Sequence, residues 1–303
     1  SISITLVSPF FFQKSLYNAA MPELPEVETV RTDLKRKLLN KRIKEVEVRL
    51  PKIVRPKNFA ATLTQNSFVD VTRRGKLIIF HLKKKGFMLV HLKMTGQLVF
   101  RDHDQFTVGG HSQKGMGMDL PNKYSHVIFK FEDESQLFFN DLRQFGYLKI
   151  VNQTELNKVL AKFGVEPLEP EFTPEKWQKL TENRRTNIKA FLLNQAVVTG
   201  IGNIYADEVL FASHVLPTRT VNTLTTREKT AIYKNIRLIL QKAIDHRGTT
   251  FNDYVDGDGK KGSFIQFLKV FHKNGEPCPD CGAIIQKTRV VGRGTHFCKN
   301  CQV

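Results

Sequence analysis

The amino-acid sequence predicts an α+β protein of several domains: an N-terminal β-sandwich with a flanking helix, then a helical domain, then a small module that contains four cysteines. Three observations predict this organisation. One helical pattern near the start is followed by a series of short strand patterns, as expected for a sandwich with a helix packed on it. Helical patterns dominate after residue 175, and the cysteines all lie between residues 278 and 301. A chain of 303 residues is long enough for two or three domains.

The first predicted element is a helix over residues 22–40. Pro22 and Pro25 are compatible with its first turn, because the N–H groups of that turn have no helical acceptor. Apolar residues recur at helical spacing and fall on one face, namely Leu24, Val27, Val30, Leu34 and Leu38. This face is expected to pack on the sandwich.

Strand patterns follow this helix. Apolar and charged residues alternate over 43–50 with the period of two that a half-buried strand requires. Two further strands, 76–83 and 87–92, are joined by a lysine- and glycine-containing turn, and a second hairpin runs through 126–131 and 137–140. These patterns predict an N-terminal β-sandwich domain over residues 22–151.

The second half of the chain is predicted to be mainly helical. Residues 152–174 are polar and contain three prolines, which predicts a linker. Helical patterns then occupy 175–181, 185–196, 203–213 and 226–246, and a glycine-rich stretch precedes a short apolar segment at 264–271. The helical domain is therefore expected over 175–263 and the terminal module over 264–303.

The cysteines form two Cys-X-X-Cys pairs, Cys278 with Cys281 and Cys298 with Cys301, separated by sixteen residues. Two disulfides or free thiols are the alternative interpretation, but this paired spacing favours two turns that together hold one tetrahedral zinc ion. Four thiolates leave no open position for water, so the metal is expected to be structural. The terminal module is accordingly predicted to be a zinc-finger β-hairpin that carries Lys287, Arg289 and Arg293.

The formal net charge is +18, from 47 Lys and Arg against 29 Asp and Glu. A basic surface alone would account for it, but the excess also suits a polyanionic partner such as nucleic acid. No apolar run approaches the ~20 residues that a membrane-spanning helix needs. The absence of cysteines outside the terminal module favours a reducing compartment.

Residues 1–20 precede a Met21-Pro22 pair, at which removal of an initiator methionine would leave a secondary amine on Pro22. The segment contains an apolar stretch but no basic region, which argues against a secretory signal. Residues 1–21 are therefore interpreted as an extension that is non-native or removed, with a fragment of an organelle-targeting segment as the alternative.

Five motifs occur in order along the chain. The first is Pro22-Glu23-Leu24-Pro25-Glu26-Val27-Glu28, and the others are His91-Leu92-Lys93-Met94-Thr95-Gly96, Asp141-Leu142-Arg143-Gln144-Phe145-Gly146, Gly200-Ile201-Gly202-Asn203-Ile204-Tyr205-Ala206-Asp207-Glu208 and Gly292-Arg293-Gly294-Thr295-His296-Phe297-Cys298. With these motifs, residues 22–303 resemble the bacterial formamidopyrimidine-DNA glycosylase family. The resemblance implies that 185–213 form a helix–two-turns–helix module within the DNA-binding domain 175–263, and that 248–263 form a lesion-capping loop.

The resemblance also implies a bifunctional enzyme that excises oxidised purines (8-oxoguanine and formamidopyrimidines) and cleaves the abasic site by β,δ-elimination, with one structural Zn²⁺ as its only cofactor. By this resemblance Pro22 is the amine that forms a Schiff base with the sugar, and Glu23 is the acid/base carboxylate. Glu26 is a second carboxylate near the site, and Lys76 reaches the lesion and its phosphate. Without the motifs, Pro22 would be interpreted as an ordinary proline at the start of a helix, and Lys76 as a solvated lysine on the surface.

The family's DNA contacts match seven residues. Met94, Arg143 and Phe145 correspond to the side chains that fill the space left by an extruded base. His91, Lys189, Asn203 and Arg293 correspond to phosphate or minor-groove contacts. For Met94 and Phe145 the alternative is an ordinary place in the core, and for His91 a structural role in a strand.

The expected partner is double-stranded DNA with oxidised bases or abasic sites, bound by a monomer in the bacterial cytoplasm with no membrane association. Two other functions remain open. A related endonuclease VIII-like glycosylase would prefer oxidised pyrimidines, although Leu24 and the motif at 141–146 depart from that family. If residues 1–20 are retained, the nitrogen of Pro22 is an amide, and the protein would be a non-catalytic lesion-binding protein.

Overall fold

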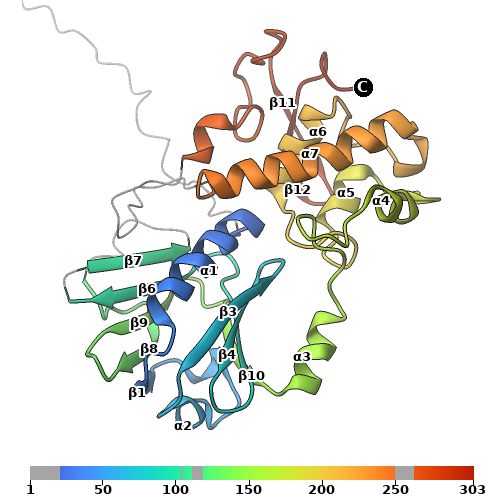
Figure 1. Ribbon diagram of the computed structural model, residues 1–303. Helices are drawn as coiled ribbons and strands as arrows, with labels where there is room; N and C mark the ends of the chain where they lie inside the picture. The colour runs from blue at the N-terminus through green and yellow to red at the C-terminus, as the bar shows by residue number, and fades with distance from the viewer. Residues whose placement is uncertain (1–20, 104, 111–118, 250–262) are drawn as a thin grey trace, which may run out of the picture.

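The computed structural model describes residues 21–103, 105–110, 119–249 and 263–303 (Figure 1). Two large parts, a sandwich and a group of helices, meet along the first helix of the chain, and a two-stranded hairpin lies against the helical part. This arrangement confirms the predicted α+β class with its three structural parts.

The sandwich contains two five-stranded sheets, ordered β1-β8-β9-β6-β7 and β2-β10-β5-β4-β3. Their side chains interdigitate in one core that is rich in phenylalanine, including Phe68, Phe80 and Phe129. The strands are β1 (Ile43–Val48), β2 (Val54–Arg55), β3 (Phe68–Arg74), β4 (Leu77–Leu82), β5 (Phe87–His91), β6 (Gly96–Asp102), β7 (Gln105–Gly110), β8 (Ser125–Phe131), β9 (Gln136–Asp141) and β10 (Tyr147–Val151). A 3₁₀ turn (Pro51–Ile53) and α2 (Phe59–Leu63) connect the first strands.

Helix α1 (Leu24–Leu38) packs most of its apolar face on the sandwich, next to β3 and β7, as predicted. Leu24, which was expected on the same face, instead packs in the core of the helical part. The predicted strict alternation in the first strand is wrong, because a register shift between Ile43 and Glu45 leaves Ile43 and Val46 as its buried residues. The two predicted hairpins are confirmed as β4–β5 and β8–β9, which pair antiparallel.

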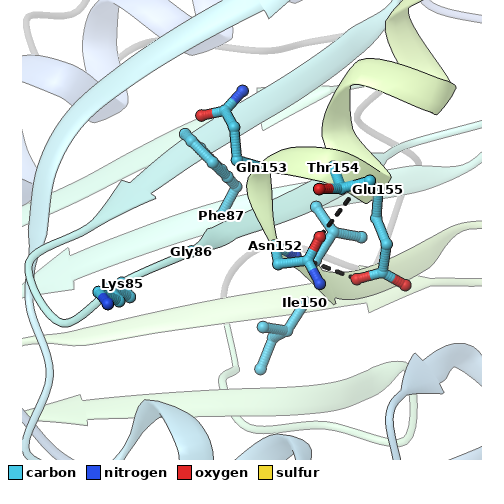
Figure 2. A pocket seen from close by; sticks show the side chains of 9 residues that line it. Lys85, Gly86, Phe87, Ile150, Asn152, Gln153, Thr154 and Glu155 are labelled. Carbon is cyan, nitrogen blue, oxygen red and sulfur yellow. Dashed lines mark hydrogen bonds between the residues drawn. The ribbon is translucent and has the colours of Figure 1, made fainter.

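Residues 152–174 are not wholly a linker, because α3 (Gln153–Leu160) occupies their first part. Asn152 accepts a hydrogen bond from the Glu155 N–H, and the Glu155 carboxylate accepts one from the Asn152 N–H, so a complete capping box begins the helix (Figure 2). Leu156 then packs on the outer face of the second sheet. The three prolines all lie beyond this helix and therefore do not interrupt it.

A pocket of about 610 Å³ lies where α3 begins, between the ends of β5 and β10 (Figure 2). Its lining includes Lys85, Phe87, Ile150 and Glu155. None of the residues predicted for the functional site lines this pocket.

The helical part contains α4 (Pro174–Thr181), α5 (Ile188–Leu193), α6 (Asn203–Ala212) and α7 (Thr226–Asp245). Helix α6 is almost entirely buried and lies against both α5 and α7, which explains its mainly apolar sequence. Short 3₁₀ turns, Val221–Thr223 and Phe264–Phe267, lie before and after α7. The four predicted helices are thus present, with ends within a few residues of the predicted ones.

The terminal hairpin pairs β11 (Gln286–Val290) with β12 (Arg293–Phe297) in antiparallel register. Beta12 lies next to α6. Among the described residues, no helix is both long enough and apolar enough to cross a membrane.

Candidate active site

The start of α1 lies against the start of α6. Glu23 is the N-cap residue of α1, so Pro22 precedes the helix and is not part of its first turn as predicted. The Leu24 N–H donates to the Gly200 carbonyl at 3.0 Å. The start of the sandwich domain is thereby fixed to the loop that leads into α6.

The Glu23 side chain is only 2% exposed. Its carboxylate accepts hydrogen bonds from the backbone N–H groups of Gly202 at 2.6 Å, Ile204 at 2.8 Å and Tyr205 at 3.4 Å. These groups belong to the first turn of α6, where N–H groups have no helical acceptor and favour an anion. The carboxylate therefore occupies the anion site of a helix from the other domain.

Gly202 makes this approach possible. A Cβ atom built on Gly202 would lie 2.4 Å from the Glu23 carboxyl carbon, closer than any side chain tolerates. The backbone conformation of Gly202 does not itself need glycine, because its φ is −130°. The requirement at this position is therefore one of space for Glu23.

The pKa of Glu23 is raised to about 7, mainly by burial and also by the neighbouring Glu26, against the lowering effect of the Lys76 charge and the α6 N–H groups. Burial lowers the pKa of the Lys76 ammonium, against the attraction of Glu23 and Glu26. The two groups are thus neighbours whose protonation is linked.

Lys76 follows the tight Gly75 turn between β3 and β4, where Gly75 has a φ of +55°. Among the described residues, the Lys76 ammonium has neither a hydrogen bond nor an ion pair. It is therefore free to bind an anion or a carbonyl oxygen.

The Lys76 turn is held by Glu166, a residue of the predicted linker for which no role was predicted. Glu166 accepts from the Gly75 N–H at 2.8 Å and from Arg73 at 2.5 Å, and Arg73 also pairs with Glu28 at 2.9 Å. This ion network is nearly buried, with side-chain exposures of 7% for Arg73 and 2% for Glu166. It fixes the turn between the two domains.

Glu26 completes the capping box of α1 by accepting from the Glu23 N–H at 3.0 Å. Its second oxygen accepts from the Tyr205 hydroxyl at 2.6 Å and from the N–H and hydroxyl of Thr249 at 2.8 and 2.9 Å. Sequence reasoning missed the roles of Tyr205 and Thr249. Most of the predicted capping loop 248–263 lies outside the described residues, but its base is tied here to the helix that carries Glu23.

Three predicted residues gather at one surface of the sandwich. The Arg143 guanidinium donates to the Met94 sulfur at 3.1 Å and lies 4.9 Å from the centre of the Phe145 ring. Phe145 is 53% exposed, so it is not part of the core. The structure thus brings Met94, Arg143 and Phe145 together with their side chains accessible.

His91 ends β5 and is partly buried against Tyr147, with the ring centres 5.8 Å apart. Its Nδ1 accepts from the Lys93 N–H at 3.0 Å. Burial, with the Lys93 and Lys76 charges, lowers the pKa of His91 to about 3, so its ring is neutral at neutral pH. Any phosphate contact of His91 is therefore a neutral hydrogen bond.

Lys189, which was expected to bind phosphate, is buried in the structure and has protein partners. Its side chain is 0% exposed, and its ammonium binds Asp207 at 2.6 Å, the Thr295 hydroxyl at 2.8 Å and the Gly294 carbonyl at 3.2 Å. Lys189 therefore joins the helical part to the terminal hairpin. The sequence does not reveal this role, because the partners are 18 and about 105 residues away.

Asn203 lies at the first position of α6, as predicted, but its surroundings differ from the predicted phosphate site. Its side-chain amide donates to the Gly294 carbonyl at 2.9 Å, and the neighbouring N–H groups are occupied by Glu23. The backbone part of the expected phosphate site is therefore already filled. Arg293 is exposed on β12, where it can reach a ligand.

The four cysteine sulfurs lie within 4.8 Å of one another. Cys278 and Cys301 are 3.8 Å apart and Cys281 and Cys298 are 3.5 Å apart, close to the spacing of about 3.8 Å that Zn–S bonds of 2.3 Å produce in a tetrahedron. The residues thus fit one structural Zn²⁺, which holds the hairpin that carries Arg293.

Comparison with known proteins agrees with this geometry. Residues 21–148 match the formamidopyrimidine-DNA glycosylase N-terminal domain, 163–254 match its H2TH domain, and 275–303 match a zinc finger found in FPG and IleRS. A formamidopyrimidine-DNA glycosylase of Pelotomaculum thermopropionicum is 42% identical over 287 residues, which cover 93% of this chain and 99% of the relative. The chain belongs to the formamidopyrimidine-DNA glycosylase family.

Other members of the formamidopyrimidine-DNA glycosylase family are similarly close. The protein of Symbiobacterium thermophilum is 41% identical over 288 residues, covering 93% of this chain and 89% of that protein. A Lactococcus lactis FPG mutant in complex with Fapy-dG-containing DNA matches with a TM-score of 0.83 at 33% identity, over 93% of this chain and 99% of that one. The L. lactis protein with abasic-site DNA gives a TM-score of 0.81 at the same identity, over 92% and 99%.

Proposed function

We propose that this protein is a DNA repair glycosylase that excises oxidised purines, 8-oxoguanine and formamidopyrimidines, from duplex DNA and then cleaves the abasic site by β,δ-elimination. One observation carries the proposal. Pro22 directly precedes a buried carboxylate, Glu23, that is held by the start of α6 and interacts with the Lys76 ammonium. A nucleophile, a proton carrier and a cation thereby meet at the boundary of two domains.

The chemistry requires a secondary amine on Pro22. The amine attacks C1′ of the damaged nucleotide, the bond to the base breaks, and the base leaves with its electron pair and takes up a proton. Opening of the sugar ring then gives a cationic iminium, which withdraws electrons from the neighbouring carbons and permits elimination of the phosphates. A peptide bond to Met21 would make the nitrogen an unreactive amide, so the active form begins at Pro22.

Glu23 is suited to carry the protons of these steps. Burial raises the pKa of this carboxyl group, which helps it to hold a proton, donate it to the opening sugar and accept one back. Lys76 is placed to bind the phosphate or base oxygen of the lesion, since no described residue neutralises it.

The accessible group Met94, Arg143 and Phe145 supports action on duplex DNA. An enzyme that acts on a base has to extrude it, and apolar and hydrogen-bonding side chains can occupy the vacated space. Phe145 supplies a flat apolar wedge, and Arg143 can bind the base left on the opposite strand. The excess of positive charge suits the DNA backbone.

The similarity to DNA-bound L. lactis structures supports the same partner. We place the protein, as a monomer, in the bacterial cytoplasm on chromosomal DNA. Zinc stays structural, because four thiolates leave no position for water or substrate.

Parallel assays on duplexes with 8-oxoguanine opposite cytosine and with thymine glycol test the substrate class. The chain that begins at Pro22 is expected to cleave the 8-oxoguanine duplex faster. Faster cleavage of the thymine-glycol duplex would favour the endonuclease VIII-like alternative. Binding of both without cleavage would favour a lesion-binding protein.

A further inference from the structure

Two loops that carry the Met94, Arg143 and Phe145 group leave the sandwich at one point. Beta6 begins at Gly96 and β9 ends at Asp141, and these two residues are paired across the sheet. The loop before Gly96 carries Met94, and the loop after Asp141 carries Arg143 and Phe145. A group placed at this pair of residues can therefore set the positions of both loops.

The side chain of Asp141 is such a group. One carboxylate oxygen accepts from the Thr95 hydroxyl and from the Arg143 N–H at 3.2 Å, and the other accepts from the Gly146 N–H at 2.7 Å. The Thr95 hydroxyl oxygen in turn accepts from the Arg143 N–H at 2.9 Å. One carboxylate thus binds both ends of the 142–146 loop and the residue next to Met94.

This contact is buried, whereas the side chains it serves are accessible. Asp141 is 0% exposed and Thr95 1% exposed, and no described residue forms an ion pair with Asp141. A Cβ atom on Gly146 would lie 2.6 Å from the Phe139 ring and 3.1 Å from the Asp141 carboxylate, so the loop backbone is pressed against this carboxylate. A buried carboxylate without a cation is costly unless its hydrogen bonds are satisfied, as they are here by backbone and hydroxyl donors.

Within the described part of the chain, the exposed side chains have no comparable support of their own. Arg143 contacts Met94 and Phe145, and these contacts join members of the group to one another. Their common position relative to the sheet therefore depends on the backbone of the two loops.

We propose that Asp141 is the positioning residue for the group that occupies the space of an extruded base. This inference rests on the proposed glycosylase function. It assigns Asp141 to the step in which the base leaves the duplex, and it gives Asp141 no part in bond cleavage at Pro22.

Substitution of Asp141 by asparagine tests the role with almost no change in volume. An amide has one accepting oxygen, so its NH₂ group faces either the Gly146 N–H, where two donors meet, or the Thr95 hydroxyl, which then has to turn and accept instead of donating. In neither orientation are all the contacts of the Asp141 carboxylate with the two loops kept. We expect excision of 8-oxoguanine from duplex DNA to slow on the order of 10- to 100-fold, because the wedge is displaced by about an ångström.

The readout compares two substrates with the chain that begins at Pro22. Single-stranded DNA with an abasic site has neither a base to extrude nor an opposite base to contact, so Asp141→Asn is expected to cleave it within about twofold of the wild-type rate. The matched control is Asp133→Asn, which removes a carboxylate from the exposed turn at the other end of the same β8–β9 hairpin. It is expected to leave both rates unchanged.

A fluorescent base analogue next to the lesion reports unstacking directly, and its signal on binding is expected to fall in Asp141→Asn. An equal loss of cleavage rate on the duplex and on the single-stranded substrate, or no loss of rate on either, would overturn the positioning role. If Asp141→Asn does not fold, Thr95→Val, which removes only the hydroxyl contact, is subject to the same comparison and the same outcomes. Wild-type protein that cleaves neither substrate would instead refute the proposed function.

Discussion

The buried Glu23 carboxylate makes a prediction about stability and pH. Glu23→Gln replaces a titrating group by one of nearly equal volume that does not titrate. In the native protein the pKa of Glu23 is raised from 4.5 to about 7, mainly by burial. Between these values the unfolded chain releases the proton and the native protein keeps it.

The sign and size follow from this difference. Because the unfolded state binds fewer protons in this window, the free energy of unfolding falls as the pH rises. The full shift corresponds to about 3 kcal/mol, of which about 2.5 kcal/mol is lost between pH 5 and pH 8. Below the unfolded pKa the stability is fully present, and above the native pKa no further change is expected.

Denaturant unfolding of wild type and Glu23→Gln measures this term. Trp177 is the only tryptophan and is buried in the helical part that contains α6, so its fluorescence reports unfolding of the contact partner of Glu23. The full chain is used, in which the nitrogen of Pro22 is an amide, and work stays above pH 5 because zinc thiolates protonate in acid.

The stability difference, wild type minus variant, is expected to decrease by about 2.5 kcal/mol from pH 5 to pH 8. A stability difference that stays constant within about 0.5 kcal/mol would refute the reasoning. The predicted change of about 2.5 kcal/mol is larger than the scatter expected of matched extrapolations. In a chain that begins at Pro22, an ammonium next to Glu23 would lower the pKa of Glu23 and reduce the decrease.

Substitutions at three other positions test further contacts. Gly202→Ala displaces the Glu23 carboxylate and is expected to slow cleavage of abasic DNA on the order of 100-fold while the circular dichroism spectrum is kept, and a near-normal rate would contradict the packing argument. Lys76→Met removes an attraction that lowers the pKa of Glu23, so the decrease in the free energy of unfolding should extend to higher pH. Lys76→Arg keeps the charge and should preserve the wild-type dependence of stability on pH. Identical pH dependence in the two variants would exclude the linkage between Lys76 and Glu23. Cys298→Ser is expected to lose zinc and weaken DNA binding while residues 22–151 stay folded, and retained zinc with full affinity would refute the metal site.

Local patterns predicted the elements whose periodicity is set by one buried face. The apolar face of α1 and the hairpins β4–β5 and β8–β9 are examples, because each has one side in the core. Beta6 was not assigned, since five of its residues in succession are buried and give no alternation. Helix α3 was not predicted, because it is short and lies in a polar segment with three prolines, although the Asn152 capping box marks its start.

The candidate site was predictable where the chemistry lies in adjacent residues. Two Cys-X-X-Cys pairs specify a zinc site by spacing alone, and the motif at Pro22 places the amine next to Glu23. The contacts of Glu166 with Gly75 and of Glu23 with Gly202 join residues 91 and 179 positions apart. No local pattern encodes such distances, and the buried contacts of Lys189 were not predicted for the same reason.

Trapping with borohydride on abasic-site duplex tests the central claim most directly, because it reduces an iminium to a stable amine bond. The chain that begins at Pro22 is expected to form a covalent protein–DNA complex, and mass spectrometry of the digest is expected to locate the bond at Pro22. The chain with residues 1–21 attached is expected to form none. A complex with the unprocessed chain, or no complex with the chain that begins at Pro22, would contradict the account.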